Sequence, residues 1–242
     1  MKKMLIIIGT VLLVLGFNYA ASAWVYVPDQ GDTGWKSYTY TAGSGGFTGS
    51  AGFVVSNVID TSAYPELLLD NLKGGGGTNL SFETGNFTGY TFVDELPQMS
   101  FANVSDVVTA YSYTAYSATD GTYFADLQGL YLPNLHWGIT TSQFHNATGQ
   151  AGTVGSILER AITLAAGAPF SFDWAFLGSD FSPWDDFALF YLKDANGGIV
   201  FSEGLAQIGS APAVPLPSTL LLLGSGLCGL LGLGRRVKRR VG

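Results

Sequence analysis

The sequence predicts an all-β protein, a jelly-roll-like β-sandwich flanked by an N-terminal signal peptide and a C-terminal transmembrane helix. Short runs of β-branched and aromatic residues alternate with clusters of Gly, Ser, Asn and Asp through the middle of the 242-residue chain. Such runs are typical of strands joined by turns. The same region has no sustained 3.6-residue apolar period, apart from a short piece near Val154–Ala166. Both ends, in contrast, are apolar segments next to basic residues.

The clearest strand predictions follow from composition and from the turn residues on either side. They are Trp35–Thr41, Gly52–Ile59, Leu67–Leu72, Val107–Tyr116, Tyr123–Gln128, Phe170–Leu177, Phe187–Leu192 and Ile199–Ser202. Four consecutive glycines, Gly74–Gly77, divide a β-rich N-terminal part, residues 24–77, from the predicted sandwich domain, residues 78–208. The sequence leaves open whether the N-terminal part packs as a domain of its own.

Two segments on opposite sides of the glycine run share a pattern. Gly52–Leu72 and Ser171–Leu192 each contain an apolar strand, a turn with Asp, Pro and an aromatic residue, and a second apolar strand. The pattern fits an internal duplication, and it equally fits two unrelated hairpins.

The N-terminus has the three parts of a secretory signal peptide in order. A basic start, an apolar run and a small-residue cleavage site follow one another at Lys2-Lys3, Leu5–Phe17 and Ala21-Ser22-Ala23. The apolar run is shorter than the roughly 20 residues that a spanning helix needs, which disfavours an uncleaved anchor. We therefore expect export through the Sec machinery and cleavage by signal peptidase between Ala23 and Trp24, which removes residues 1–23.

The C-terminus combines a proline-containing linker, an uncharged stretch and a basic cluster. In the linker, residues 209–217, Pro215 and Pro217 keep the chain extended and accessible. Residues 218–234 carry no charge and are long enough to form a transmembrane helix. The tail, residues 235–242, holds five basic residues that the positive-inside rule places in the cytoplasm: Arg235, Arg236, Lys238, Arg239 and Arg240.

The order of these parts resembles the PEP-CTERM sorting domain. The motif that carries the resemblance is Val214-Pro215-Leu216-Pro217-Ser218-Thr219, followed by the Leu/Gly-rich helix and the arginine cluster. Leu216 stands where that family usually has Glu. The resemblance implies recognition by an exosortase, a membrane-embedded transpeptidase-like enzyme of Gram-negative bacteria that make exopolysaccharide. A plain C-terminal membrane anchor is the alternative interpretation.

Charge and cysteine content restrict the function classes. All 18 acidic residues lie between the two ends, together with only four basic ones, so this region has a formal charge of −14. Nucleic acid is therefore excluded as a partner, because binding it requires a basic surface. The charge suits divalent cations, and it equally suits simple solubility. The only cysteine, Cys228, lies in the predicted tail helix, so a disulfide within the exported region is excluded.

A second resemblance concerns calcium. Asn79–Tyr90, NLSFETGNFTGY, is similar to the opening of galactose-binding-like jelly rolls, and Phe172–Leu192 is similar to the late strands of extracellular domains that precede PEP-CTERM tails. In such domains a Glu of the opening strand and an Asp of a late strand often hold calcium, which corresponds here to Glu83 with Asp185 or Asp186. Neighbouring strand residues point to opposite faces, so only one of the two aspartates is expected to be a ligand.

Asp173 and Asp180 are further candidate neighbours of that site, although Asp beside Ser and Pro is more often a turn residue. No other cofactor is expected.

Catalytic motifs are missing from the sequence. The two histidines, His136 and His145, are nine residues apart, and no G-x-S-x-G, H-E-x-x-H or P-loop pattern occurs outside the tail. Nothing marks two of the acidic residues as a glycosidase pair. We therefore expect that the protein is not an enzyme.

Taken together, these features predict an exported cell-surface or extracellular matrix protein that the tail holds transiently in the inner membrane until an exosortase-like enzyme processes it. Its expected role is structural or adhesive and linked to exopolysaccharide and biofilm. A calcium-dependent carbohydrate-binding module is the alternative, which aromatic residues such as Trp174 and Trp184 would serve. A secreted polysaccharide hydrolase is the third interpretation.

Overall fold

The computed structural model describes residues 24–60, 62–93, 102–110, 114–129 and 139–211. The predicted signal peptide and nearly all of the C-terminal sorting region lie outside these ranges. The chain divides into two compact units, Met1–Gly209 and Ser210–Gly242, and all the strands of the described ranges belong to the first unit. Within the described ranges, no helix is long and apolar enough to cross a membrane.

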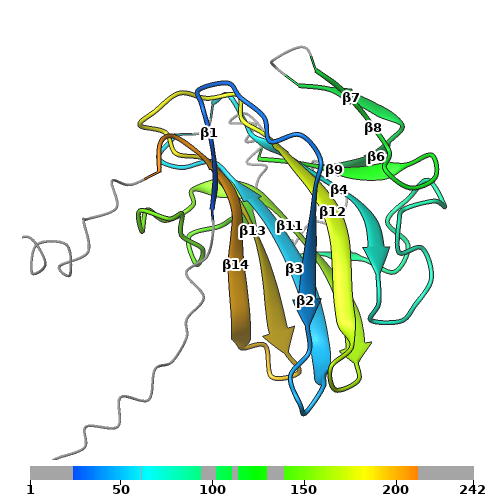
Figure 1. The fold of residues 1–242 in the computed structure, drawn as a ribbon. Helices are drawn as coiled ribbons and strands as arrows, with labels where there is room; N and C mark the ends of the chain where they lie inside the picture. The colour runs from blue at the N-terminus through cyan, green and yellow to red at the C-terminus, as the bar shows by residue number, and fades with distance from the viewer. Residues whose placement is uncertain (1–23, 61, 94–101, 111–113, 130–138, 212–242) are drawn as a thin grey trace, which may run out of the picture. The chain divides into compact units, whose positions relative to one another are not determined.

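Two large β-sheets pack face to face in the described residues of the first unit (Figure 1), beside a two-stranded sheet, which confirms the predicted all-β sandwich. The first sheet, sheet A, has the strand order β1 (Val25–Val27), β14 (Ile199–Ile208), β13 (Phe187–Asp194), β3 (Phe47–Ser56), β11 (Val154–Leu164) and β10 (Ile139–Thr140). A short further strand, β5 (Thr91–Phe92), also pairs with β11. All neighbours in this sheet are antiparallel except β1 and β14.

The second sheet, sheet B, is antiparallel throughout. Its order is β2 (Lys36–Thr41), β12 (Pro169–Leu177), β4 (Glu66–Lys73), β9 (Phe124–Gln128) and β6 (Ala102–Ser105). The part before the glycine run supplies β1 to β4, and these strands interleave with later strands in both sheets. The described residues of 24–77 and of 78–208 therefore build one sandwich.

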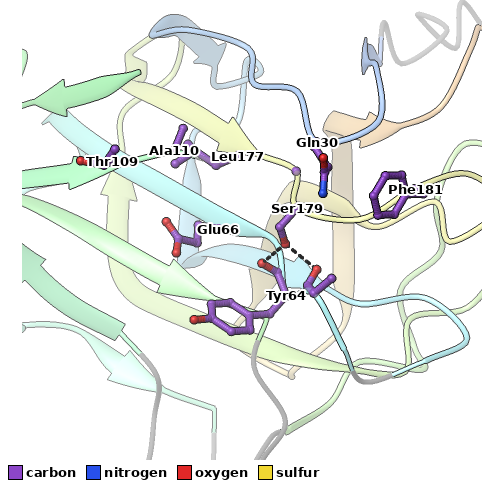
Figure 2. A pocket seen from close by; sticks show the side chains of 10 residues that line it. Gln30, Tyr64, Glu66, Thr109, Ala110, Leu177, Ser179 and Phe181 are labelled. Atoms are coloured by element: carbon purple, nitrogen blue, oxygen red, sulfur yellow. Dashed lines mark hydrogen bonds between the residues drawn. The ribbon is translucent and has the colours of Figure 1, made fainter. Parts of the chain in front are cut away.

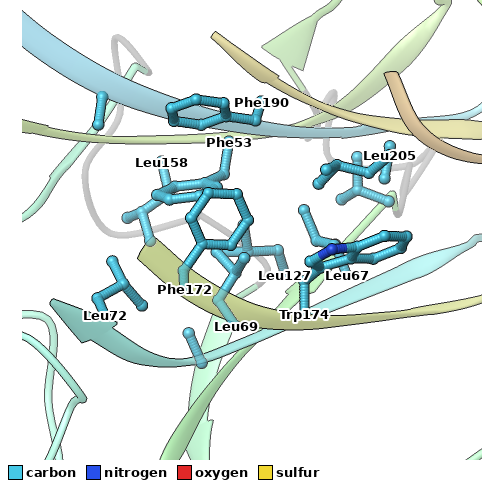
Figure 3. Close-up of a cluster of buried hydrophobic side chains, with 14 of the residues drawn as sticks. Phe53, Leu67, Leu69, Leu72, Leu127, Leu158, Phe172, Trp174, Phe190 and Leu205 are labelled. Atoms are coloured by element: carbon cyan, nitrogen blue, oxygen red, sulfur yellow. The ribbon is translucent and has the colours of Figure 1, made fainter. Parts of the chain in front are cut away.

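The core lies between the sheets and is rich in phenylalanine (Figure 3). Phe53 and Phe190 of sheet A meet Phe172 of sheet B, with ring centroids about 5 Å apart. Alternation along each strand explains the arrangement, because every second residue points to the same face. Burial of this apolar area is the main favourable term in folding.

The prediction for Val107–Tyr116 was wrong in detail. The segment forms two short strands, β7 (Val107–Thr109) and β8 (Ala115–Ser117), which pair as a hairpin. The chain reverses where the amide of Ala110 donates to the carbonyl of Thr114. Composition alone did not reveal the division into two strands, because the segment lacks the Gly and Pro that usually mark a turn.

The helix-like period near Val154–Ala166 is also misleading, because Val154–Leu164 is strand β11. The period arises from two charged residues that the strand buries: Glu159 is 8% exposed and Arg160 is 4% exposed. Glu159 accepts hydrogen bonds from Tyr191 and Lys193. Arg160 donates to the carbonyl oxygens of residues 76 and 78. These partners allow polar groups to occupy a buried strand.

The two segments with a shared pattern are not hairpins. Gly52–Leu72 contains β3 and β4, and Ser171–Leu192 contains β12 and β13, and each pair crosses from one sheet to the other. β3 lies beside β13 while β4 lies beside β12. Their two connecting loops, residues 57–65 and 178–186, meet at one end of the sandwich, where Ser179 Oγ contacts the carbonyl oxygens of Ala63 and Tyr64.

Candidate ligand-binding pocket

The outer face of sheet B is apolar where a hairpin covers it. Along β4, Leu67 and Leu69 belong to the main core, whereas Leu68 points outward. Leu68 packs with Leu177 and with Tyr116 of the β7–β8 hairpin in a separate buried cluster. The hairpin therefore shields part of the sheet, and its edge leaves an opening beside it.

A pocket of about 640 Å³ lies at this edge (Figure 2). This volume is in the range of small-molecule sites in proteins. The lining residues come from β4, β12, the hairpin and three loops: Gln30, Ala63, Tyr64, Glu66, Thr109, Ala110, Leu177, Gly178, Ser179 and Phe181. Each loop enters from a different part of the sequence, so the pocket exists only in the folded chain.

Hydrogen bonds join the three loops that form one wall. The amide of Gln30 donates to the carbonyl of Asp180 at 3.0 Å, and the amide of Gly178 donates to the carbonyl of Gly31 at 2.8 Å. The hydroxyl of Ser179 lies within hydrogen-bond distance of the carbonyl oxygens of Ala63 and Tyr64 (Figure 2). These contacts order the wall before a ligand binds, so binding loses less conformational entropy.

Two acidic side chains of the outer sheet face lie close enough to affect each other. Glu66 is opposite Gln128, and Leu68 is opposite Asp126, so Glu66 and Asp126 point to the same side. Burial, and secondarily the charge of Asp126, raises the pKa of Glu66 to about 8. Burial raises the pKa of Asp126 to about 6. At pH 7 Glu66 is therefore mostly protonated and presents both a hydroxyl donor and a carbonyl acceptor.

Two exposed aromatic rings complete the pocket. Tyr64 is 37% exposed and Phe181 is 45% exposed, and both line the opening. In the view of Figure 2, Glu66 lies between the Tyr64 ring and the hairpin residues Thr109 and Ala110. Aromatic faces with neutral hydrogen-bonding groups nearby suit ligands that have both apolar and hydroxyl surfaces. Sugar rings are such ligands.

An acidic cluster lies behind the loop wall. Asp180 is 4% exposed and Asp186 is fully buried, and both flank the loop that carries Phe181. Asp186 Oδ1 accepts a 2.8 Å hydrogen bond from the amide of Val58, but its Oδ2 has no partner. Asp180 Oδ1 accepts from the amide of Phe181 at 2.7 Å, and its Oδ2 also has no partner.

The cluster disfavours its own ionisation. Burial, with the charges of Asp180, Asp60 and Asp185, raises the pKa of Asp186 well above its ordinary value. Burial, with the charges of Asp60 and Asp29, also raises the pKa of Asp180. Burial of a carboxylate without a compensating cation has this effect.

The sequence-predicted calcium ligands are only partly brought together. Asp185 and Asp186 are adjacent members of the acidic cluster, and Asp185 Oδ1 has no partner either. Glu83 lies elsewhere, where its carboxylate accepts hydrogen bonds from the amides of Thr122 and Tyr123. Glu83 is not among the groups that act on Asp186. Within the described ranges, no three acidic, His or Cys side chains converge as a metal site.

Other candidates from the sequence have structural positions. Asp173 lies on β12 and accepts hydrogen bonds from Ser37, Asn71 and Thr119. The ring of Trp174 fills the main core and is 4% exposed. Tyr116 belongs to the hairpin cluster.

Sequence reasoning missed the pocket residues. Glu66 carried a signal, because it is a single acid that directly precedes three leucines in a predicted strand. No sequence pattern indicated Tyr64 or Phe181, because they line one pocket only after their two loops come together in the fold. The segment around Asp180 has the composition of a turn, and the near-complete burial of this residue depends on packing that the sequence does not show.

Comparison with known proteins concerns the C-terminus. Residues 213–240 match a family model described as the PEP-CTERM protein-sorting motif. The motif implies an exported, surface-sorted protein that an exosortase processes, as the sequence predicted. No curated protein matches the chain.

Proposed function

We propose that the protein is a non-enzymatic surface or matrix protein whose β-sandwich associates with exopolysaccharide. The sorting motif at residues 213–240 carries the export part of this proposal. Cleavage of a signal peptide before Trp24, transient anchoring through residues 218–234 and a structural or adhesive role in biofilm complete it. A jelly-roll connectivity and a galactose-binding-like relationship remain predictions.

The pocket supports carbohydrate as the ligand class. Tyr64 and Phe181 provide exposed rings against which the C–H faces of a sugar pack, while Glu66 and Gln30 provide hydrogen-bonding groups for its hydroxyls. None of the described residues that line the pocket is basic, which favours a neutral or amino sugar over an acidic one. This is the carbohydrate-binding alternative that the sequence also allowed.

A polysaccharide hydrolase needs two carboxyl groups with different pKa values, and burial raises the pKa values of Glu66 and Asp126 to different levels. Only Glu66 lines the pocket, however, whereas Asp126 is 3% exposed. A second carboxylate has to reach the substrate or a water molecule for hydrolysis. This geometry favours binding over catalysis.

Intact mass spectrometry of the protein from its native cells tests the sorting proposal. We expect a species that starts at Trp24 and ends near Pro217. A species that retains Arg235–Arg240 would contradict processing and leave an ordinary membrane anchor.

Glycan binding by the full chain in detergent tests the pocket. Tyr64→Ala and Phe181→Ala should each weaken binding about 10-fold, because each removes one stacking face. Tyr123→Ala is the matched control, since Tyr123 is 36% exposed and does not line the pocket. Equal binding by all four proteins would exclude this pocket, and hydrolysis of the glycan that Glu66→Gln abolishes would favour an enzyme.

A further inference from the structure

The strongest unexplained feature of the molecule is a pair of buried carboxylates with unused oxygens. Asp180 Oδ2 and Asp186 Oδ2 are both buried and lack a hydrogen-bond partner. A buried polar atom without a partner costs about 1 to 3 kcal/mol, and a charged one costs more. Folded proteins rarely tolerate such atoms, and an unseen ion or water is a common explanation.

The described loops around these oxygens carry no Lys or Arg. Three loops meet at the cluster, residues 28–35, 57–65 and 178–186, and none contains Lys, Arg or His. A fourth segment reaches it where the side-chain amide of Asn146, which follows His145, donates to the carbonyl of Asp185. The three loops contribute instead further acids, Asp29, Asp60 and Asp185. The charges that act on each buried carboxylate are thus negative.

The four Lys and Arg residues of the described ranges lie in other places. Lys193 forms an ion pair with Glu159, and the Arg160 guanidinium lies 4.8 Å from the Tyr90 ring centroid. Lys73 acts on Asp173, and Lys36 lies on β2 opposite Trp174. Among the described residues, therefore, no Lys or Arg side chain is placed to compensate the two carboxylates.

We propose that a calcium ion binds between Asp180 and Asp186, with Oδ2 of each residue as a ligand. Two carboxylates do not fill six to eight coordination positions, so backbone carbonyl oxygens and water have to complete the shell. Such a mixed oxygen set is usual for calcium. Within the described ranges no three acidic, His or Cys side chains converge as a metal site, so carboxylates alone do not complete the shell. Asp60 and Asp185 increase the negative potential around the ion.

Calcium fits this site better than the other common metals. The available ligands are hard oxygens, which excludes ions that prefer thiolate or imidazole. Magnesium requires a small, near-octahedral shell and gives up water reluctantly, whereas calcium accepts irregular oxygen sets. The site differs from the one that the sequence resemblance implied, because it uses Asp180 in place of Glu83.

Occupancy would act on the neighbouring pocket. Asp180 lies between Ser179 and Phe181, which both line the pocket, and its carbonyl accepts the amide of Gln30 from a second wall loop. An ion that fixes Asp180 would therefore fix the wall against which a sugar packs. This consequence, unlike the ion site itself, rests on the proposed function.

Calcium titration of the full chain in detergent, followed by thermal unfolding, tests the site. After removal of metal with EDTA, saturating calcium should raise the Tm by roughly 5 to 10 °C at 100 times its Kd. Asp180→Asn and Asp186→Asn should each abolish the rise, because they remove the charge while keeping the side-chain shape. The same concentration of magnesium should raise the Tm less.

Glu83→Gln is the matched control, because Glu83 is a carboxylate that backbone amides already satisfy. It should keep the full calcium response. If Glu83→Gln loses the response while Asp186→Asn keeps it, the proposed site is wrong. Isothermal titration of the unmodified chain covers the case in which a variant fails to fold: one bound calcium per chain is expected, and no bound calcium overturns the proposal.

The outcomes separate the two proposals. Calcium binding without glycan binding would keep the ion site and remove the carbohydrate pocket. Glycan binding that is unchanged by EDTA would keep the pocket and show that the ion does not control its wall.

Discussion

Two acidic clusters in the same sandwich differ in how their buried carboxylates are satisfied. Asp70 and Asp186 are both 0% exposed. Asp70 accepts hydrogen bonds from the amides of Asn71, Thr119 and Asp120, at 2.6 to 2.9 Å, and from the Thr119 hydroxyl. Asp186 accepts one, from the amide of Val58. Equal burial is therefore combined with very different hydrogen bonding.

The difference in hydrogen bonding explains the different pKa values of the two clusters. Burial raises the pKa of Asp70, and its hydrogen bonds oppose that rise. For its neighbour Asp173, where burial is weaker, hydrogen bonds from Ser37, Asn71 and Thr119 bring the pKa below its ordinary value. These two residues organise the turn before β9 and need nothing further. The Asp180–Asp186 cluster lacks such donors, so it depends on protons or a cation.

The largest expected loss of stability comes from a change at Asp70, whose carboxylate is fully hydrogen-bonded. Asp70→Ala would remove the fully buried acceptor of three partly buried amides, so we expect a loss of about 3 kcal/mol in the free energy of unfolding. Urea denaturation followed by tryptophan fluorescence measures it, in calcium and in EDTA alike. A loss below about 1 kcal/mol would show that water replaces the carboxylate easily.

Dependence on pH should come from the unsatisfied acids. The pKa of Glu66 in the folded state, about 8, lies above its ordinary value of 4.5. The folded state therefore holds the proton more tightly, and stability falls as pH rises from about 4.5 through 8. In EDTA we expect a decrease on the order of 2 kcal/mol over this range.

The acids of the calcium cluster should add to this decrease in the same direction, because burial and their neighbours also raise the pKa values of Asp180 and Asp186. The groups that face them are Asp29, Asp60 and Asp185, all of the same charge. Glu66→Gln should remove the part of the pH-dependent loss of stability that comes from Glu66. Calcium should reduce the part that comes from Asp180 and Asp186. Stability that increases with pH under these conditions would contradict both assignments.

Replacing Asp by Asn should change the free energy of unfolding in opposite directions in the two clusters. In EDTA at pH 7, Asp186→Asn should raise the free energy of unfolding by about 1 kcal/mol, because it removes a buried uncompensated carboxyl group and keeps an acceptor for Val58. The same exchange at Asp70 should be destabilising. Chemical denaturation of both variants in one buffer makes the comparison, and destabilisation at both positions would contradict it.

The sequence predicted the sandwich because the short apolar run Leu67–Leu72 and the alternating run Phe170–Leu177 are both typical of strands. It failed where packing overrides local pattern. Glu159 and Arg160 gave β11 a helical period, since their partners come from other parts of the chain. The segment Val107–Tyr116, which is divided between β7 and β8, contains no glycine or proline to mark the division.

The candidate sites also divide into residues that the sequence predicted and residues that only tertiary structure brings together. Asp185 and Asp186 were predicted from a resemblance, and they lie in the acidic cluster, whereas Glu83 is bound to Thr122 and Tyr123 instead. The pocket was not predictable, because Tyr64 and Phe181 are 117 positions apart in sequence. The sorting motif was predictable because it is a short linear pattern that requires no tertiary structure.

A crystal structure of the protein grown with calcium tests the central claim, that one cluster is complete and the other is built for a cation. We expect anomalous density about 2.3 to 2.6 Å from Asp180 Oδ2 and Asp186 Oδ2, with no ion at Asp70 or Asp173. An empty Asp180–Asp186 site in millimolar calcium, or an ion at Glu83 instead, would contradict the account.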